Sequence, residues 1–177
     1  MSQGRRGPGV AWDSTRKALY VFGGWDGGTC YTGFLRTSEM FLSNQWSPLA
    51  DMHRSRRCFN PFWHSCLVYL CGGCYTNSVE TYDPRSNTFT LQDFTLPEES
   101  LTTAVVSCGE LTVISRNYIS KLQQGRLTSQ KHPEYDVWSN CTPVVSAGAV
   151  YVVRIGDNCC CSIDLTTGAV RKSVSLS

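Results

Sequence analysis

The residues of this chain with the clearest potential for chemistry are its ten cysteines, two of which form the pattern Cys71-Gly-Gly-Cys74. Two thiols at this spacing are typical of disulfide exchange or of half of a zinc site. A zinc site needs a second pair of ligands, and Cys159-Cys-Cys161 has the wrong spacing, although two of its sulfurs could in principle contribute. We therefore interpret the cysteines as small buried thiols and expect neither a metal nor a cofactor.

The other chemistry-bearing residues show no catalytic arrangement. The three histidines, His53, His64 and His132, lack the spacing of metal ligands. Glu98-Glu99 is interpreted as a solvated loop segment, and the sequence contains neither a glycine-rich phosphate loop nor a nucleophile elbow. From these observations we predict that the chain is not an enzyme.

Composition restricts the classes of partner. The chain has 177 residues, 41% hydrophobic and 17% charged, with a net charge of +2. These values are typical of a globular domain, and the charge is too small to indicate nucleic-acid binding. No apolar run approaches the roughly 20 residues of a membrane span, and the first eight residues lack the apolar segment of a secretory signal. We expect a cytoplasmic or nuclear protein with reduced thiols, and neither a nucleic-acid nor a membrane partner.

Short strands must position these residues, and their spacing indicates a repeat. Leu19–Gly24 and Leu67–Gly73 are apolar runs that end in a glycine pair, and Gly23 and Gly72 lie 49 residues apart. A β-rich repeat of this length is typical of a propeller blade. The second strands end near residues 24, 73, 116 and 156, which predicts one domain over residues 1–177 with blades at 7–50, 57–96, 101–140 and 142–177.

The third blade has the weakest pattern. Residues 102–107 and 111–115 form a hairpin signal around Cys108-Gly-Glu110. Residues 125–135 are expected to be a loop, and Val137-Trp138 is expected to be the fourth strand.

Residues 66–92 resemble the kelch repeat. The pair Gly72-Gly73 is followed by Tyr82-Asp83-Pro84 and then by Phe89 in the fourth strand, and Arg56 precedes Gly72 by 16 residues. The resemblance is specific over residues 6–98 and weak beyond them.

The first blade repeats this plan with substitutions. Phe41 stands in place of the tyrosine, Trp46 supplies the aromatic residue of the fourth strand, and Arg6 precedes Gly23 by 17 residues. The resemblance implies an all-β, kelch-type β-propeller of about four blades, each a four-stranded antiparallel sheet. Propellers close with 4 to 8 blades and kelch propellers usually have six or seven, so we expect an open arc or an imperfect small ring. The chain would then be a fragment, a truncated product or half of an assembly.

One end of the blades is a candidate partner surface. In a four-stranded meander, the loops between strands two and three share a face with the linkers between blades. Arginines and aromatic residues, which are enriched at binding hot spots, gather in these loops. The predicted partner-binding residues are Trp25, Asp26, Tyr31, Phe34, Arg36, His53, Arg54, Arg57, Tyr75 and Asn77. An acidic peptide would suit the arginines, whereas the alternative is that Arg56 is structural and that Trp25 covers a blade edge.

The kelch resemblance implies a non-enzymatic protein-interaction module. Such modules include substrate-recognition arms of cullin-type ubiquitin ligases, which normally also carry a BTB or F-box domain, and cytoskeletal adaptors. Two alternatives stay open: an enzyme resembling kelch-type sugar mutarotases or oxidases, and a structural subunit of a larger assembly.

Overall fold

The computed structural model describes residues 1–29, 32–99, 102–107, 110–115, 117–123, 126–131, 144–154, 159–165, 167 and 169–175. It divides into two compact units, Met1–Ser100 and Leu101–Ser177. Each unit contains two four-stranded antiparallel sheets in which consecutive strands are neighbours. The described elements are therefore all β, and the division between the units falls between the second and third predicted blades.

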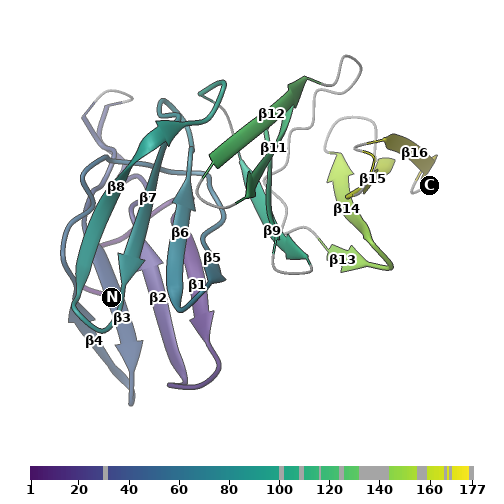
Figure 1. Cartoon of the computed structure of the whole chain (residues 1–177). Coiled ribbons are helices and arrows are strands. Elements are labelled where there is room, and N and C mark those ends of the chain that lie inside the picture. Colours follow the sequence, from purple (N-terminus) through teal and green to yellow (C-terminus); the bar gives the residue numbers. More distant parts are fainter. Residues whose placement is uncertain are drawn as a thin grey trace. The chain divides into compact units, whose positions relative to one another are not determined.

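The first unit holds the two sheets with the stronger sequence pattern (Figure 1). The strands of its first sheet are β1 (Gly9–Asp13), β2 (Ala18–Phe22), β3 (Ser38–Leu42) and β4 (Gln45–Pro48). Its second sheet contains β5 (Phe62–His64), β6 (Leu67–Cys71), β7 (Ser78–Asp83) and β8 (Thr88–Thr95). The turn before β8 has the expected chemistry, because the Asp83 carboxylate accepts a hydrogen bond from the Arg85 amide and Asn87 adopts a φ of 53°.

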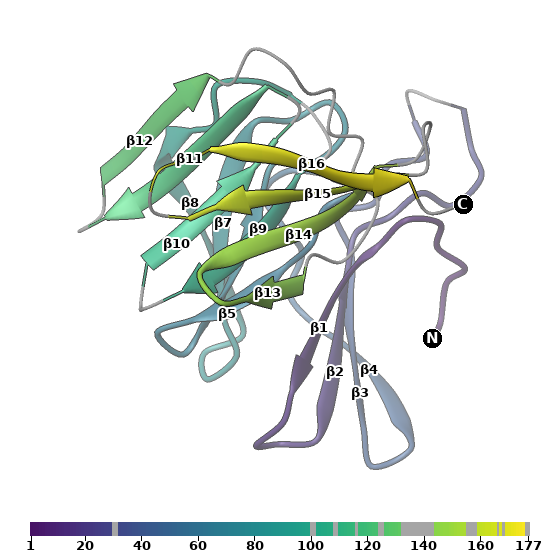
Figure 2. The same cartoon turned by 90° about the vertical axis from the view of Figure 1, so that its right-hand side faces the viewer.

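The second unit repeats the same meander, and Figure 2 shows its last four strands lying side by side. Its first sheet contains β9 (Thr103–Ser107), β10 (Glu110–Ile114), β11 (Tyr118–Gln123) and β12 (Arg126–Lys131). Its second sheet contains β13 (Val144–Ser146), β14 (Ala149–Arg154), β15 (Cys159–Asp164) and β16 (Val170–Ser175).

The prediction for the fourth strand of the third blade is wrong. Residues 126–131, which we expected to be a loop, form β12 and pair with β11, with Leu122 opposite Leu127. β12 is an edge strand with mostly exposed side chains, so it needs no apolar run, and periodicity alone does not reveal it. Val137-Trp138 lies outside the described residues.

An aromatic core joins the two sheets of the first unit. Phe22 of β2 contacts Tyr82 of β7 and Phe89 of β8, with ring centroids 5.6 and 6.0 Å apart, and Tyr20 lies 6.0 Å from Tyr82. Met52 of the linker between the sheets is fully buried in the same cluster. Such large rings bury about 150–250 Å² each, so the two sheets stabilise each other. In the second unit, a smaller aliphatic cluster that includes Ile114, Val150 and Ile163 joins its two sheets.

Candidate functional site

A buried ion pair fixes the linker between the two sheets of the first unit. Arg56 Nη2 lies 2.7 Å from Glu80 Oε1, and both side chains have 0% exposure. Arg56 Nη1 also donates hydrogen bonds to the carbonyls of Leu70, Gly72 and Ser78 at 3.3, 2.8 and 3.0 Å. Because so many bonds converge on it, Arg56 belongs to the framework of the unit and not to an exposed surface.

Glu80 holds the same linker from inside the sheet. Its carboxylate accepts hydrogen bonds from the backbone amides of His53 and Arg54, at 2.7 and 3.0 Å. The His53 ring lies 3.1 Å from the Phe89 carbonyl, so this side chain also has a local structural contact. One buried carboxylate thus sets the path of the linker that carries Arg54.

The first sheet has an equivalent ion pair. The spacing to Gly23 had indicated Arg6 as the counterpart of Arg56, but Arg5 forms the pair. Arg5 Nη2 lies 3.0 Å from Glu39 Oε2, and Arg5 Nη1 donates to the Gly23 carbonyl at 2.9 Å. Arg6 lies in an extended bridge with Trp25, in which neighbouring side chains point in opposite directions. Arg5 therefore turns inward while Arg6 lies over the Trp25 ring, 5.5 Å from its centroid.

The glycine pairs let the linker approach the sheets. Gly23 has a φ of +59°, and a Cβ at this position would lie 2.3 Å from the Arg56 carbonyl oxygen. Gly73 has a φ of +118°, and its Cβ would lie 2.8 Å from the Arg57 carbonyl oxygen. Both positions exclude other residues for two reasons, the left-handed backbone and the close carbonyl. The glycine signal in the sequence thus marks the contact between blade and linker.

Arg57 and three other predicted site residues form one cluster. Its guanidinium lies 4.9 Å from the centroid of Phe34 and 5.7 Å from that of Trp25. Tyr75 stacks at a tilt on Phe34, with 5.3 Å between centroids. We name Trp25, Phe34, Arg57 and Tyr75 the arginine–aromatic cluster. Contacts of a cation with ring faces are each worth about 0.5–2 kcal/mol, so the cluster stabilises this end of the unit.

A shallow hollow of about 420 Å³ borders this cluster. Arg54, Tyr75 and Asn77 line it together with Gln92 and Glu99. Arg54 is exposed, and its guanidinium has no hydrogen bond or ion pair with another described residue. Tyr75 is 64% exposed. The hollow therefore combines an available cation with an open aromatic face.

The remaining predicted residues have local contacts. Asp26 accepts a hydrogen bond from the Gly28 amide in its own turn, and Arg36 Nε donates to the Met52 carbonyl at 2.7 Å. Asn77 lines the hollow, but its side-chain amide donates to the Leu96 carbonyl at 3.1 Å. Tyr31 lies outside the described residues. The site predicted from the sequence is thus divided between a cluster, a hollow and several structural side chains.

The structure pairs Cys74 with Cys58, a residue that the sequence analysis did not single out. The Cys74 amide donates to the Arg57 carbonyl at 3.0 Å, which brings the Cys74 thiol within reach of a hydrogen bond from Cys58. This bond and the neighbouring Arg57 outweigh burial and lower the pKa of Cys74 to about 6, while the same bond and burial raise the pKa of Cys58. Cys71 is buried as expected, and desolvation raises its pKa to about 12 despite the nearby Arg56 charge. No spacing signal could reveal the pair, because Cys58 and Cys74 come from the linker and the β6–β7 loop.

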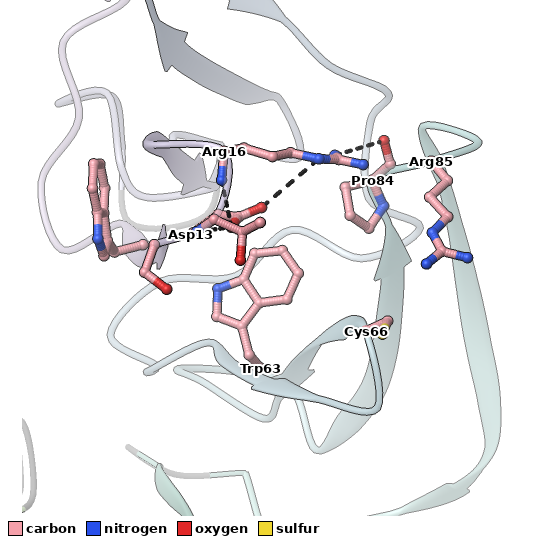
Figure 3. Close-up of a pocket in the computed structure, with 9 residues that line it drawn as sticks. Asp13, Arg16, Trp63, Cys66, Pro84 and Arg85 are labelled. Carbon is pink, nitrogen blue, oxygen red and sulfur yellow. Dashed lines mark hydrogen bonds and ion pairs between the residues drawn. The ribbon is translucent and has the colours of Figure 1, made fainter.

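A second hollow, of about 520 Å³, lies at the opposite ends of the strands, beside the β1–β2, β5–β6 and β7–β8 turns. Figure 3 shows the Trp63 indole pointing toward Asp13 and Arg16. Arg16 Nη1 donates to the Pro84 carbonyl at 3.3 Å, and its pKa is raised first by the hydrogen bond to Tyr20. Trp12, which also lines this hollow, is 52% exposed.

Two classes of feature are not found in the described part of the chain. No group of three or more His, Cys, Asp or Glu side chains there is placed to hold a metal ion. No helix there has the length and apolar character that a membrane span requires.

The comparisons with known proteins identify the fold. No protein-family model and no curated protein sequence matches the chain. Among solved structures, YjhT is similar at a TM-score of 0.72 and 11% identity, over 100% of this chain and 67% of YjhT. A catalytically inactive virginiamycin B lyase from Staphylococcus aureus, crystallised with quinupristin, is similar at a TM-score of 0.72 and 12% identity, over 100% of this chain and 58% of the lyase. Both are β-propeller proteins, so the four sheets have the architecture of propeller blades.

One expectation from the sequence is corrected by this result. We predicted that the chain is not an enzyme, and the similarity to a propeller protein that is itself a lyase overturns that prediction. The absence of a familiar catalytic motif was a poor guide, because a propeller scaffold hosts binding and catalysis alike. The chain has a β-propeller fold, and the kelch assignment stays a prediction.

Proposed function

We propose that the first unit is a recognition module of the kelch-type propeller class, which binds an acidic segment of a partner protein at the hollow beside Tyr75. The supporting observation is the exposed Arg54 guanidinium, which has no described partner, next to a Tyr75 ring that is 64% exposed. Arginine and tyrosine are enriched among residues that dominate binding energies. A role as a substrate-recognition arm of a ubiquitin ligase or as a cytoskeletal adaptor extends this proposal.

The charges around the hollow suggest how such a segment would bind. Glu99 lines the same hollow and would repel a second carboxylate near it. We therefore place the acidic side chain of the ligand beside Arg54 and an apolar side chain on the Tyr75 ring. Since Phe34 packs against Tyr75 and Glu80 holds the linker, this surface is formed before a ligand arrives.

The test is a charge reversal at Arg54 with a matched control. Fluorescein-labelled peptides rich in Glu, each with one aromatic residue, are titrated with the full chain and followed by anisotropy. An exposed ion pair contributes about 0.2–1 kcal/mol, so we expect Arg54→Ala to weaken binding up to about fivefold. Arg54→Glu should weaken it further and reduce its salt dependence, whereas Arg85→Glu, at an exposed arginine near the opposite strand ends, should have little effect. Equal affinities for Arg54→Glu and Arg85→Glu would refute this binding site.

An enzyme built on the same scaffold is the second candidate. It is favoured by the similarity to the lyase and by the hollow of about 520 Å³ that contains Trp63 and Arg16. Exposed indoles are suited to ring-shaped ligands such as sugars, the substrates of the mutarotase alternative. Tryptophan fluorescence titrations with monosaccharides test it, and a saturable change that Trp12→Ala abolishes would support a substrate site there.

A further inference from the structure

We propose that Cys74 and Cys58 form a thiol-reactive site that exchanges with small disulfides and closes a Cys58–Cys74 disulfide. In this pair Cys74 is the attacking thiolate and Cys58 is the resolving thiol. The inference is independent of peptide binding, since it rests on the backbone contact between the Cys74 and Cys58 segments and on the neighbouring Arg57. It replaces the Cys71–Cys74 pairing that the sequence pattern suggests, because Cys71 is only 2% exposed.

Backbone hydrogen bonds hold the Cys58 and Cys74 segments next to each other. The Cys74 amide donates to the Arg57 carbonyl at 3.0 Å, and the Cys58 amide donates to the Gly7 carbonyl at 2.8 Å. Gly73 permits this approach, since a Cβ there would lie 2.8 Å from the Arg57 oxygen. Both cysteines are half-buried and not fully buried as Cys71 is. A Cys58–Cys74 disulfide would therefore join two segments that already share a backbone hydrogen bond.

The local charges favour a thiolate at Cys74. The ionisable groups that act on its sulfur are Cys58, which donates a hydrogen bond, and Arg57, which supplies a positive charge and a second hydrogen bond. With a pKa of about 6, Cys74 is mostly thiolate at pH 7. The Arg57 guanidinium itself packs against the Trp25 and Phe34 rings, 5.7 and 4.9 Å from their centroids.

The reaction balances with a disulfide, RSSR, as the oxidant. The Cys74 thiolate attacks one sulfur of RSSR, and the broken S–S bond leaves its electron pair on RS⁻, which takes up a proton. Cys58 then loses its proton to water and attacks Cys74 Sγ in the mixed disulfide, releasing the second RS⁻, which is also protonated. The two protein thiols lose two electrons and two protons, and RSSR becomes two RSH.

The expected rate of exchange at Cys74, relative to a peptide cysteine, identifies the pH at which the experiment is most informative. Relative to a peptide thiol of pKa about 8.5, a thiol of pKa about 6 has roughly 30 times more thiolate at pH 7 and roughly 150 times more at pH 6. The lower basicity reduces its intrinsic nucleophilicity roughly tenfold. We therefore expect exchange at Cys74 to be only about threefold faster than at a peptide cysteine at pH 7, but roughly 15-fold faster at pH 6.

The experiment treats the reduced full chain with glutathione disulfide at pH 6, quenches with acid, alkylates the remaining thiols and maps the peptides by mass spectrometry. We expect a Cys58–Cys74 disulfide in the native chain and a glutathione adduct on Cys74 in Cys58→Ser. Cys74→Ser should leave Cys58 unmodified. The control Cys66→Ser, at an exposed cysteine outside the pair, should react as the native chain does.

A second measurement separates reactivity from mere proximity. The alkylation rate of Cys74 with iodoacetamide should rise through a midpoint near pH 6, and Arg57→Met should move that midpoint upward. The proposal is overturned if Cys74 in the folded chain reacts no faster than a cysteine peptide at pH 6. It is also overturned if treatment with glutathione disulfide links Cys74 to another cysteine in preference to Cys58. Circular dichroism of each variant confirms that the chain is folded.

Discussion

Removing the charge of Glu80 should destabilise the first unit more than any surface substitution. The Arg56–Glu80 pair has 0% exposure on both sides, and Glu80 also accepts two backbone hydrogen bonds from the linker. Breaking a buried pair by removing one partner costs about 3–5 kcal/mol, because the other charge stays buried without compensation. A unit of this size has a total stability of about 5–15 kcal/mol, so the loss is a large fraction of it.

The loss of stability depends on which hydrogen-bond acceptors the substituted side chain keeps. Glu80→Gln keeps an acceptor oxygen for the linker amides, so we expect a loss near 3 kcal/mol; Glu80→Leu removes both acceptors and should cost more. The matched control is Asp13→Asn, since the Asp13–Arg16 pair is long, at 3.9 Å, and its Arg16 side chain is 43% exposed, against 14% for Asp13. A long pair with one solvent-exposed partner contributes about 0–1 kcal/mol.

Urea unfolding followed by tryptophan fluorescence is the appropriate assay. Four of the five tryptophans lie in the first unit, at positions 12, 25, 46 and 63, so the signal reports mainly on that unit. The double variant Arg56→Met with Glu80→Leu should lose less than the sum of its single variants, because it leaves no unpaired charge. A loss below about 1 kcal/mol for Glu80→Gln, equal to that of Asp13→Asn, would refute the argument that this pair anchors the linker.

Two further predictions concern the same framework. Gly23→Ala should destabilise the first unit by at least about 1–3 kcal/mol in the same assay, since its Cβ would lie 2.3 Å from the Arg56 oxygen at a φ of +59°, whereas Gly4→Ala, with nothing within 4 Å, should be nearly neutral. Burial acts to raise the pKa of Glu39, but hydrogen bonds from Ser2 and Arg5 outweigh it and hold the pKa below its usual value. A lowered pKa stabilises the fold above the unfolded value of about 4.3, and that contribution is lost as the pH falls toward the folded pKa. Acid titration of Glu39→Gln should therefore show a shallower fall in stability below pH 4 than the native chain, and identical curves would contradict this role.

Much of the fold could be predicted from local patterns. The apolar run of β6, the turn at Asp83 and the aromatic Phe89 of β8 are recognisable in order along the chain, because each depends on neighbouring residues. β12 could not be found in this way, since an edge strand with exposed side chains has no apolar periodicity. Only its pairing with β11 makes it a strand.

The candidate site depended more strongly on tertiary structure. The meander order predicted that the loops carrying Trp25, Arg57 and Tyr75 share one end of the unit, but it could not predict that Arg57 lies over two rings. The spacing to the glycine pair favoured Arg6 as the counterpart of Arg56, because Arg5 lies one residue further from Gly23. Only the direction of the side chains in the bridge with Trp25 shows that Arg5 takes this role. The exclusion of catalysis failed because it relied on the absence of known motifs.

The sequence by itself determined the repeat of short strands, the glycine pairs and the end of the blades at which arginines and aromatic residues gather. These features are encoded locally, by side-chain alternation and by residues that tolerate a positive φ. The tertiary structure alone decided that Cys74 faces Cys58 and not Cys71, and that Arg57 lies beside it. The physical reason is that these contacts join a linker to a loop of the next sheet, and their distances are set by packing around Arg56 and Glu80 and not by separation along the chain.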